Sequence, residues 1–313
     1  MTVPTIPTEA EIAAAVERCR PLIRRTPVVE TAPGDLGIDA AVTLKLESLQ
    51  YAGSFKARGS LNSALASDIP ASGLIAASGG NHGIAVARTA RVLGVPAEIF
   101  VPGVSARAKV DRVRAQGATV HVSGALYDDA QAACDARAAE SGALNIHPYD
   151  ASLTVAGQAT LGVELGEQVP EVDTVVVAVG GGGLVAGIRL ALPHVRIVAV
   201  ETPACNALHA AQQAGDRVGV SPAGVAADAL GAKQIGFLPW AILAGAVDSV
   251  LVDDADAVSA RQAMWDEMQV AVEPAAAVAL AAVRAGAYEP AAGERVAVIV
   301  CGGNVDPGNL TAG

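Results

Sequence analysis

The sequence is poor in several features, and each shortage excludes a class of protein. Aromatic residues make up 3% of its 313 residues, which leaves few rings for stacking on nucleic-acid bases. Basic residues are outnumbered by acidic ones, 21 to 32, which gives a net charge of −11. Such a charge disfavours partners that are themselves polyanions. We therefore expect neither a nucleic acid nor a membrane among the partners of this chain.

Cysteines and long apolar runs are scarce as well. The four cysteines lie far apart and form no CxxC pair, which fits free thiols in a reducing compartment better than a disulfide framework. The opening residues, MTVPTIP, lack the basic and apolar regions of a secretory signal. No stretch of about 18 residues is continuously apolar in the manner of a membrane span. These observations predict a compact cytoplasmic protein.

Buried strand-like runs alternate with helical segments along most of the chain. Strands are expected at residues 73–77, 97–101, 119–122, 172–179, 196–201 and 294–300, with helices between them. This alternation predicts an α/β fold with two domains of twisted, parallel-type sheets flanked by helices. We place a small substrate-side domain at residues 50–147, inserted in a large domain of residues 1–49 and 148–313. Residues 202–247 are less regular, with a helix-like stretch at 205–215 and a bend at 237–240.

Lysine is also scarce, and the position of one lysine, Lys56, suggests a functional role. The chain has four lysines against seventeen arginines, and Lys56 lies between Phe55 and Ala57 where a helix is expected to begin. An amine close to apolar groups loses its proton more easily, because desolvation penalises the ammonium form. A neutral amine is what Schiff-base chemistry requires. The alternative is an ordinary solvated lysine in the first turn of a helix.

Three glycine-containing loops, like Lys56, follow the carboxyl end of an expected strand, the edge where open α/β sheets bind ligands. The run of four glycines at 180–183, followed by Leu184, lets backbone N–H groups converge on one anion at a helix N-terminus. It matches neither GxGxxG nor the P-loop. The run therefore predicts a phosphate cradle, although a tight strand-to-helix turn would also use small residues.

The other two loops are Ser78 to Gly83 and Cys301 to Asn304. In the first, backbone N–H groups and the Ser78 hydroxyl could hold a carboxylate, and Asn81 could bind a phenolic oxygen; an ordinary capped turn is the alternative. Cys301 could be a buried small hydrophobe or an uncharged partner for a ring nitrogen. The five histidines are dispersed, which argues against a histidine-based metal site.

Taken together, these motifs resemble the pyridoxal-phosphate enzymes of the tryptophan-synthase β fold, and most of all the serine/threonine dehydratase family, which includes serine racemase. The matching segments are residues 53–59, 78–83, 180–184 and 301–304, in the same order along nearly the whole chain. The resemblance implies pyridoxal 5′-phosphate as the cofactor and the type II fold of such enzymes. It also implies a cytoplasmic homodimer acting in amino-acid metabolism.

The resemblance also implies roles for individual residues. Lys56 would be the Schiff-base lysine and the base that removes the Cα proton. The implied cofactor-binding residues are Phe55, Lys56, Asn81, Gly180, Gly181, Gly182, Gly183, Leu184 and Cys301. The implied substrate-binding residues are Ser78, Gly79, Asn81 and His82. The implied reaction is that of an ammonia-lyase: dehydration and deamination of L-threonine or L-serine to a 2-oxo acid and ammonia.

This sequence departs from the family pattern at two positions, and these departures limit the reactions and ligands that we expect. Racemases of the family carry a second serine, an acid/base group, at the position of Gly79, and glycine has no proton to transfer; this argues against racemisation. Some relatives bind a divalent cation through a glutamate that Glu201 matches, but the second ligand position is Ala207. We therefore expect no metal, with a weak cation site near Glu201 left open. The alternatives are dehydration of another β-hydroxy amino acid, of the 3-hydroxyaspartate or phenylserine type, racemisation, or a non-enzymatic cofactor-binding protein.

Overall fold

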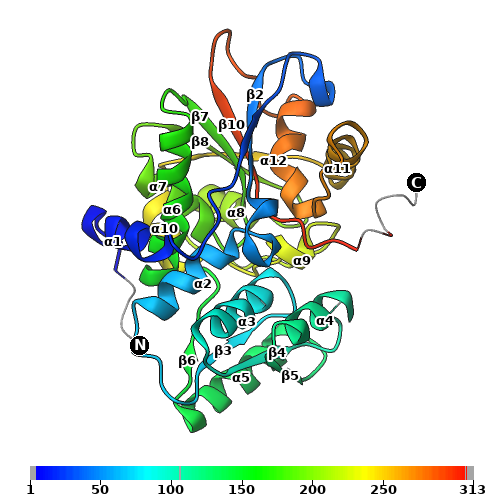
Figure 1. The fold of residues 1–313 in the computed structure, drawn as a ribbon. Helices are drawn as coiled ribbons and strands as arrows, with labels where there is room; N and C mark the ends of the chain where they lie inside the picture. Colours follow the sequence, from blue (N-terminus) through cyan, green and yellow to red (C-terminus); the bar gives the residue numbers. More distant parts are fainter. Residues whose placement is uncertain (1–4, 106, 307, 309–313) are drawn as a thin grey trace.

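The computed structural model describes residues 5–105, 107–306 and 308, which form two separate β-sheets with helices on their faces (Figure 1). The larger sheet has six strands in the order β1-β2-β10-β7-β8-β9, and all neighbours are parallel except β1 and β2. Its strands are β1 (Val28–Glu30), β2 (Val42–Leu46), β7 (Thr174–Ala178), β8 (Arg196–Glu201), β9 (Asp248–Leu251) and β10 (Val296–Val300).

The smaller sheet has four parallel strands in the order β5-β4-β3-β6. These strands are β3 (Leu74–Ala77), β4 (Ala97–Val101), β5 (Thr119–Val122) and β6 (Leu144–Asn145). All four come from one continuous part of the chain, and they form the lower part of the molecule in Figure 1. The larger sheet is built from the segments before and after it.

Helices cover both faces of each sheet. In the larger part, α6 and α7 lie on one side and α11 and α12 on the other; in the smaller part, α3 and α4 lie opposite α5 (Figure 1). The α-helices are α1 (Glu9–Cys19), α2 (Lys56–Leu65), α3 (Asn81–Leu93), α4 (Arg107–Ala115), α5 (Tyr127–Ser141), α6 (Ser152–Gln168), α7 (Gly183–Ala191), α8 (Ala207–Ala214), α9 (Ala227–Leu230), α10 (Phe237–Leu243), α11 (Asp254–Met268) and α12 (Pro274–Arg284). Short 3-10 turns lie at Asp35–Gly37, Glu47–Leu49 and Tyr51–Gly53.

The composition of the central elements explains why they are buried. Strand β7 reads Thr-Val-Val-Val-Ala and every residue of it is buried, as expected for a parallel strand covered by helices on both faces. Helix α12 is rich in alanine, begins with Pro274 after Glu273, and buries nine of its eleven residues. Small side chains allow such a helix to pack closely on the sheet. The main core therefore lies between the larger sheet and its helices.

The predicted fold class is confirmed: the chain is α/β, with parallel sheets flanked by helices. Several local predictions were wrong. Helix α3 begins at Asn81, inside the loop expected at residues 78–83, and the expected bend at 237–240 lies inside α10. The short strands β6 and β9 were missed. The domain boundaries at 49/50 and 147/148 remain a prediction. Within the described ranges, no helix is long and apolar enough to cross a membrane.

Candidate active site

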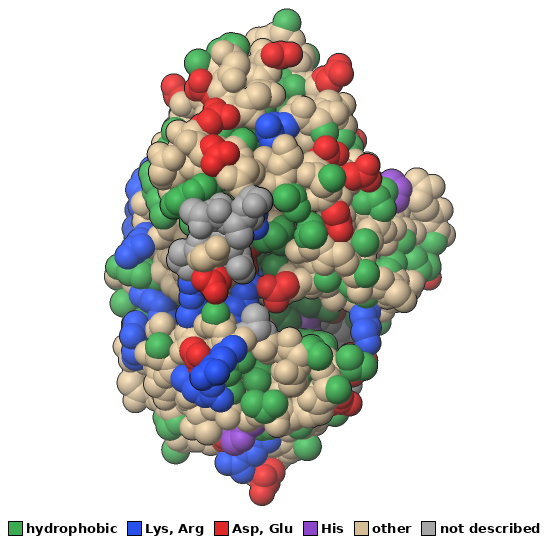
Figure 2. Space-filling view, turned by 90° about the vertical axis from the view of Figure 1, so that its right-hand side faces the viewer, with side chains coloured by type: hydrophobic (Ala, Val, Ile, Leu, Met, Phe, Trp, Pro, Cys, Tyr) green, Lys and Arg blue, Asp and Glu red, His purple; other side chains and the backbone are tan. Residues whose placement is uncertain are grey.

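One cavity of about 770 Å³ lies at the carboxyl edges of the two sheets. The surface is hollowed between the larger and smaller parts of the molecule (Figure 2). Every residue with a predicted cofactor or substrate role lines this cavity, although these residues come from four separate segments. They are Phe55, Lys56, Ser78, Gly79, Asn81, His82, Gly180, Gly181, Gly182, Gly183, Leu184 and Cys301.

Lys56 is the first residue of α2, as the sequence predicted, and its amine faces the cavity. The preceding turn is tied to the end of β10, because Phe55 N–H donates to the carbonyl of Cys301 at 3.2 Å. The Lys56 amine donates to the carbonyl of Pro148 at 2.8 Å. Desolvation lowers the pKa of Lys56 to about 8, so a large fraction of the amine is neutral near pH 8.

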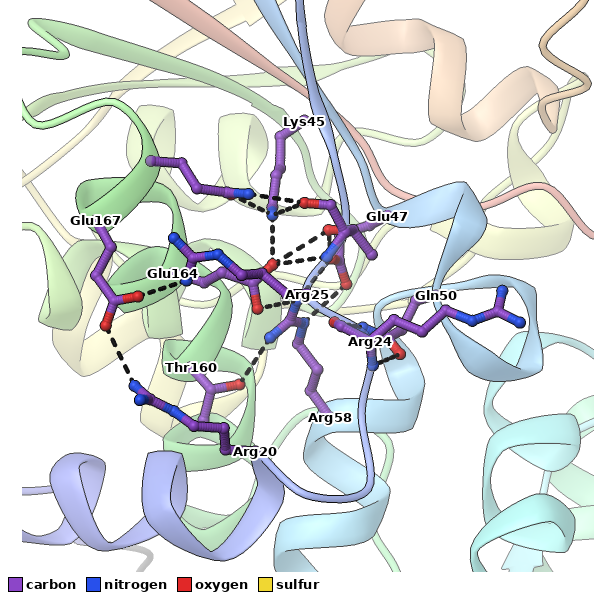
Figure 3. A network of polar contacts seen from close by, with 12 residues as sticks. Arg20, Arg24, Arg25, Lys45, Glu47, Gln50, Arg58, Thr160, Glu164 and Glu167 are labelled. Carbon is purple, nitrogen blue, oxygen red and sulfur yellow. Dashed lines mark hydrogen bonds and ion pairs between the residues drawn. The ribbon is translucent and has the colours of Figure 1, made fainter.

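A buried ionic network holds the helix that carries Lys56 (Figure 3). The Arg58 guanidinium donates to both oxygens of Glu47, at 2.8 and 2.7 Å, and to Glu164 at 3.0 Å. Lys45 completes the set with an ion pair to Glu164 at 2.5 Å. The two cations balance the two anions, and the Arg58 and Glu47 side chains are fully buried. The start of α2 is therefore fixed against β2 and α6.

The four glycines follow β7, as the sequence predicted: Gly180, Gly181 and Gly182 lie in the turn, Gly183 is the first residue of α7, and Gly182 has φ +89°. A Cβ on Gly181 would lie 2.5 Å from a ring carbon of Tyr149, and one on Gly183 would lie 2.9 Å from the Tyr149 Cα. No larger residue fits there, so the bare backbone faces the cavity at the start of a nine-residue helix. Such a site offers N–H groups and the positive end of a helix to a phosphate.

The loop after β3 is shorter than predicted, because Asn81, His82 and Gly83 form the first turn of α3. The ring of His82 is hydrogen-bonded through Nε2 to the carbonyl of Ile146 at 2.7 Å. Burial lowers the pKa of His82 to about 3, so the ring is neutral and donates to that carbonyl. His82 therefore anchors the loop and offers no positive charge to a ligand. The Ser78 hydroxyl accepts a hydrogen bond from Gly80 N–H at 3.2 Å.

Asn81 has neighbours that the sequence did not indicate. Its side-chain nitrogen donates to Glu273 at 2.6 Å, and its side-chain oxygen accepts from Asn304 at 2.8 Å. An amide nitrogen has two hydrogens, so one remains for a ligand in the cavity. Glu273 in turn accepts a hydrogen bond from Lys109 at 2.7 Å, and Lys109 is also paired with Asp228.

Cys301 follows β10 and is buried beside the Lys56 amine. Burial raises the pKa of the Cys301 thiol to about 12. The thiol is therefore uncharged at neutral pH, and the site presents a neutral sulfur where an acidic residue would present a carboxylate.

Two other cavity residues, Ser105 and Glu273, were missed by the sequence reasoning, whereas Pro148, Tyr149 and Asp228 lie in the ranges 125–150 and 221–240, where the sequence predicts the pocket for the substrate side chain. Pro148 contacts Lys56 and Tyr149 contacts the glycine run, and Ser105, Asp228 and Glu273 also line the cavity. They lie outside the glycine motifs, and only tertiary packing brings them to the cavity. The sequence neighbourhoods of Ser105 and Glu273 carry no signal that could have found them.

Glu201 lies away from this cavity. Its carboxylate accepts hydrogen bonds from the N–H groups of Leu208 and His209 at 2.9 and 2.7 Å, in the first turn of α8. Burial raises the pKa of Glu201 to about 7. In the described ranges no cluster of three or more His, Cys, Asp or Glu side chains could hold a metal ion. The weak cation site near Glu201 remains a prediction.

Comparison with known proteins identifies the family. The profile of the family described as pyridoxal-phosphate dependent enzymes matches residues 19–302. The chain belongs to this family.

Relatives place it near the serine/threonine dehydratases. An L-threonine ammonia-lyase of Geobacter sulfurreducens is 37% identical over 94% of this chain and 75% of its own length. A phenylserine dehydratase of Ralstonia pickettii is 35% identical over 96% of this chain and 94% of its own length. The structure of maize serine racemase has a TM-score of 0.91 and 34% identity, covering 99% of this chain and 96% of its own. The predicted family and its cofactor are thereby confirmed.

A pyridoxal-phosphate enzyme needs a phosphate site and an accessible amine in one cavity, and the residues here fit both needs. The bare backbone of residues 180–183 offers a phosphate its N–H groups, and the Lys56 amine faces the same cavity. As a member of this family with ammonia-lyase relatives, the protein is a pyridoxal-phosphate dependent ammonia-lyase. The comparisons support elimination from β-hydroxy amino acids as its chemistry.

Proposed function

We propose that this enzyme dehydrates L-threonine, L-serine or both, and releases a 2-oxo acid and ammonia. The proposal rests on what surrounds the amine of each lysine. Within the described part of the chain, Lys45, Lys109 and Lys233 are each ion-paired with a carboxylate, whereas Lys56 contacts none. Lys56 is therefore the one lysine whose amine is both poorly solvated and available to react in the cavity.

The residues around the cavity would have different roles in the reaction. The N–H groups of residues 180–184 would hold the phosphate of the cofactor, Asn81 its ring hydroxyl and Cys301 its ring nitrogen, with Phe55 beside the ring. Ser78, Gly79 and His82 would surround the substrate carboxylate, largely through backbone N–H groups. When bound, pyridoxal phosphate withdraws electrons from the substrate Cα. The neutral amine of Lys56 would then accept the Cα proton.

Proton transfer to Lys56 leads to loss of the β-hydroxyl as water. The released enamine then takes up water and yields the 2-oxo acid and ammonia, so that water is lost once and added once. An uncharged Cys301 would leave the ring nitrogen without a carboxylate partner. We expect this to favour rapid elimination over a long-lived carbanion.

A second candidate substrate is a bulkier β-hydroxy amino acid of the phenylserine type. Two observations favour it: the 35% identical phenylserine dehydratase and the 770 Å³ cavity, whose wall includes Tyr127 and Tyr149. A 3-hydroxyaspartate remains an alternative within the same reaction class.

A substrate panel tests the proposal. L-threonine, L-serine, phenylserine and 3-hydroxyaspartate would each be incubated with the holoenzyme, and 2-oxo acid and ammonia measured separately. We expect equimolar products, with the highest kcat/KM for L-threonine or L-serine, and none from the Lys56→Ala variant. A higher kcat/KM for phenylserine would transfer the proposal to the second candidate, and turnover by Lys56→Ala would contradict the role of Lys56.

A further inference from the structure

Two charged side chains of helix α4 hold two segments of the larger part. Lys109 and Arg112 are three residues apart and so lie on one side of this helix. Lys109 donates to the Glu273 carboxylate at 2.7 Å. Arg112 donates to the side-chain oxygen of Asn304 at 2.8 Å. Glu273 precedes α12 and Asn304 follows β10, so a single helix of the smaller part contacts both segments.

Asn81 joins these two segments through its side chain. Its amide nitrogen donates to Glu273 at 2.6 Å, and its amide oxygen accepts from the nitrogen of Asn304 at 2.8 Å. The Asn304 nitrogen also donates to the carbonyl of Ala52 at 2.8 Å. The side chains thus form one continuous chain of hydrogen bonds, which runs through Arg112, Asn304, Asn81, Glu273 and Lys109.

The charged ends of this chain fix the direction of each hydrogen bond in it. A guanidinium and an ammonium only donate, and a carboxylate only accepts. Arg112 must therefore meet the oxygen of the Asn304 amide, which turns the nitrogen of that amide toward Asn81. Asn81 must then present its oxygen to Asn304 and its nitrogen to Glu273. A reversed Asn81 amide would place its oxygen against the Glu273 carboxylate.

This chain is shielded from water where it holds Asn81. Asn304 is 6% exposed and Glu273 is 4% exposed. A change of one partner there leaves a buried polar group without its hydrogen bond, which opposes any other arrangement. Asn81 and Glu273 both line the cavity. The second N–H of Asn81, which neither partner uses, is therefore held in one orientation at the wall of the site.

We propose that Asn304 is a positioning residue for the cofactor. Together with Glu273 it holds the amide of Asn81 so that the second N–H donates to the ring hydroxyl oxygen of pyridoxal phosphate. An oxygen that accepts such a bond loses its proton more readily, because the hydrogen bond favours the charged form. The proposal rests on the role proposed above for Asn81, and it adds the residues that set the orientation of its amide.

An aspartate at residue 304 tests the direction of the chain. Asn304→Asp keeps the shape, but its oxygens only accept, so Asn81 can bond to them only by turning its nitrogen away from Glu273. The ring hydroxyl of the bound cofactor would be titrated in the reconstituted enzyme through the ratio of visible to near-ultraviolet absorbance. We expect the midpoint to rise by about 1–2 pH units, the scale of one hydrogen bond to a charged group. An unchanged midpoint would overturn the proposal.

Arg112→Met is a milder variant, and Arg114→Met on the same helix is its matched control. Without the Arg112 donor the Asn304 amide is free to turn, and we expect the midpoint to rise by about half a pH unit or more. Arg114 pairs with Asp111, and both side chains are about half exposed, so Arg114→Met should leave the midpoint unchanged. Equal midpoints in the two variants would show that α4 does not set the orientation of Asn81.

A double-mutant cycle shows whether Asn304 acts through Asn81. Asn81→Ala removes the donor and should by itself raise the midpoint. Adding Asn304→Asp should then raise it no further, because no amide remains to be turned. If the two shifts add, Asn304 affects the cofactor by another route, which contradicts the proposal.

Reversal of the chain separates orientation from stability. In Asn304→Asp/Glu273→Gln, residue 304 accepts and residue 273 can donate, so both bonds to Asn81 can form with its amide turned around. The Tm of the cofactor-free double variant should lie above that of Asn304→Asp, while the midpoint in the reconstituted enzyme stays raised. A midpoint that returns to the native value together with Tm would overturn the proposal. If the midpoints shift as expected but no β-hydroxy amino acid yields a 2-oxo acid, the proposed dehydration fails and the role of Asn304 stands.

Discussion

Lys56 differs from the other three lysines in what surrounds its amine. Lys45, Lys109 and Lys233 are each ion-paired with a carboxylate, whereas Lys56 faces a carbonyl oxygen and a neutral thiol. Burial without a counter-charge is the condition that makes an amine nucleophilic near neutral pH. The reactivity of this lysine therefore follows from its neighbours.

Covalent trapping should distinguish the four lysines. Reduction of the holoenzyme with borohydride fixes a cofactor that is bonded to an amine, and peptide mapping then locates it. We expect the label on Lys56 alone, because an ion-paired ammonium is a poor nucleophile. The other three lysines serve as internal controls, and a label on any of them would contradict the assignment.

The pKa of Lys56 predicts how cofactor uptake depends on pH. The folded pKa lies near 8 instead of 10.5, because burial disfavours the ammonium. The neutral fraction should thus reach one half at about pH 8 and level off roughly one pH unit above the pKa. The rate of pyridoxal-phosphate capture by the cofactor-free chain, followed by stopped-flow absorbance, should show the same profile. A rate that kept rising to pH 10 would indicate an ordinary, solvated lysine.

At the scale of single residues, the sequence predicted the motif-bearing part of the site and missed the rest. The glycine run, Asn81 and Cys301 were predictable because each follows a strand, and carboxyl ends of parallel strands meet at one edge. Glu273 and Ser105 were not. Each is an ordinary residue type in an ordinary segment, and only the packing of distant segments brings it to the cavity.

At the scale of elements, helix α2 depends on charges buried beneath it. Burial alone would raise the pKa of Glu47, but the Arg58 guanidinium and its hydrogen bonds hold that pKa below its ordinary value. Both partners are thus charged and desolvated. Such a pair contributes little more to the free energy of unfolding than an apolar contact would. Removing only one of its two partners, however, lowers that free energy strongly.

Removing one charged side chain of this network should lower the unfolding free energy more than removing an oppositely charged pair. Arg58→Met leaves the Glu47 carboxylate buried without its cation, and we expect a loss of about 3–5 kcal/mol in unfolding free energy. Arg58→Met/Glu47→Leu leaves Lys45 and Glu164 balanced and should recover part of that loss. Urea denaturation of the cofactor-free chain measures both.

The exposed pair Arg25–Glu167, 54% and 40% exposed, provides the comparison for this network. Arg25→Ala should cost at most about 1 kcal/mol, because solvent screens an exposed pair. A loss in Arg58→Met that is no larger than in Arg25→Ala would contradict the structural role of the network.

The elements themselves were predictable to different degrees. Strand β7 was evident from its valines, because a strand buried on both faces is apolar throughout. Strand β9, at the edge of the larger sheet, has four residues with no apolar run and was missed. The early start of α3 was missed because Gly80 and Asn81 resemble a turn. Short edge elements depend on partners that the local sequence does not contain.

At the scale of the whole molecule, the active site lies where two separately built parts meet. Lys109, on α4 of the smaller part, is buried and pairs with Asp228 and Glu273 of the larger part. Burial would lower the pKa of Lys109, but the two carboxylates raise it above its ordinary value. Lys109 is thus a charged link across the cavity, and through Glu273 it reaches Asn81.

This link predicts that Lys109 keeps the two parts closed. In Lys109→Met two carboxylates lose their shared cation, and we expect the unfolding free energy to fall by about 3–5 kcal/mol. Amide exchange should increase at residues 78–82 and 227–232, which line the cavity. Arg114→Ala is the matched control on the same helix, because its pair with Asp111 is about half exposed and should contribute no more than about 1 kcal/mol. If both variants exchange alike at the cavity, the two parts are held together by their apolar contacts and not by this cation.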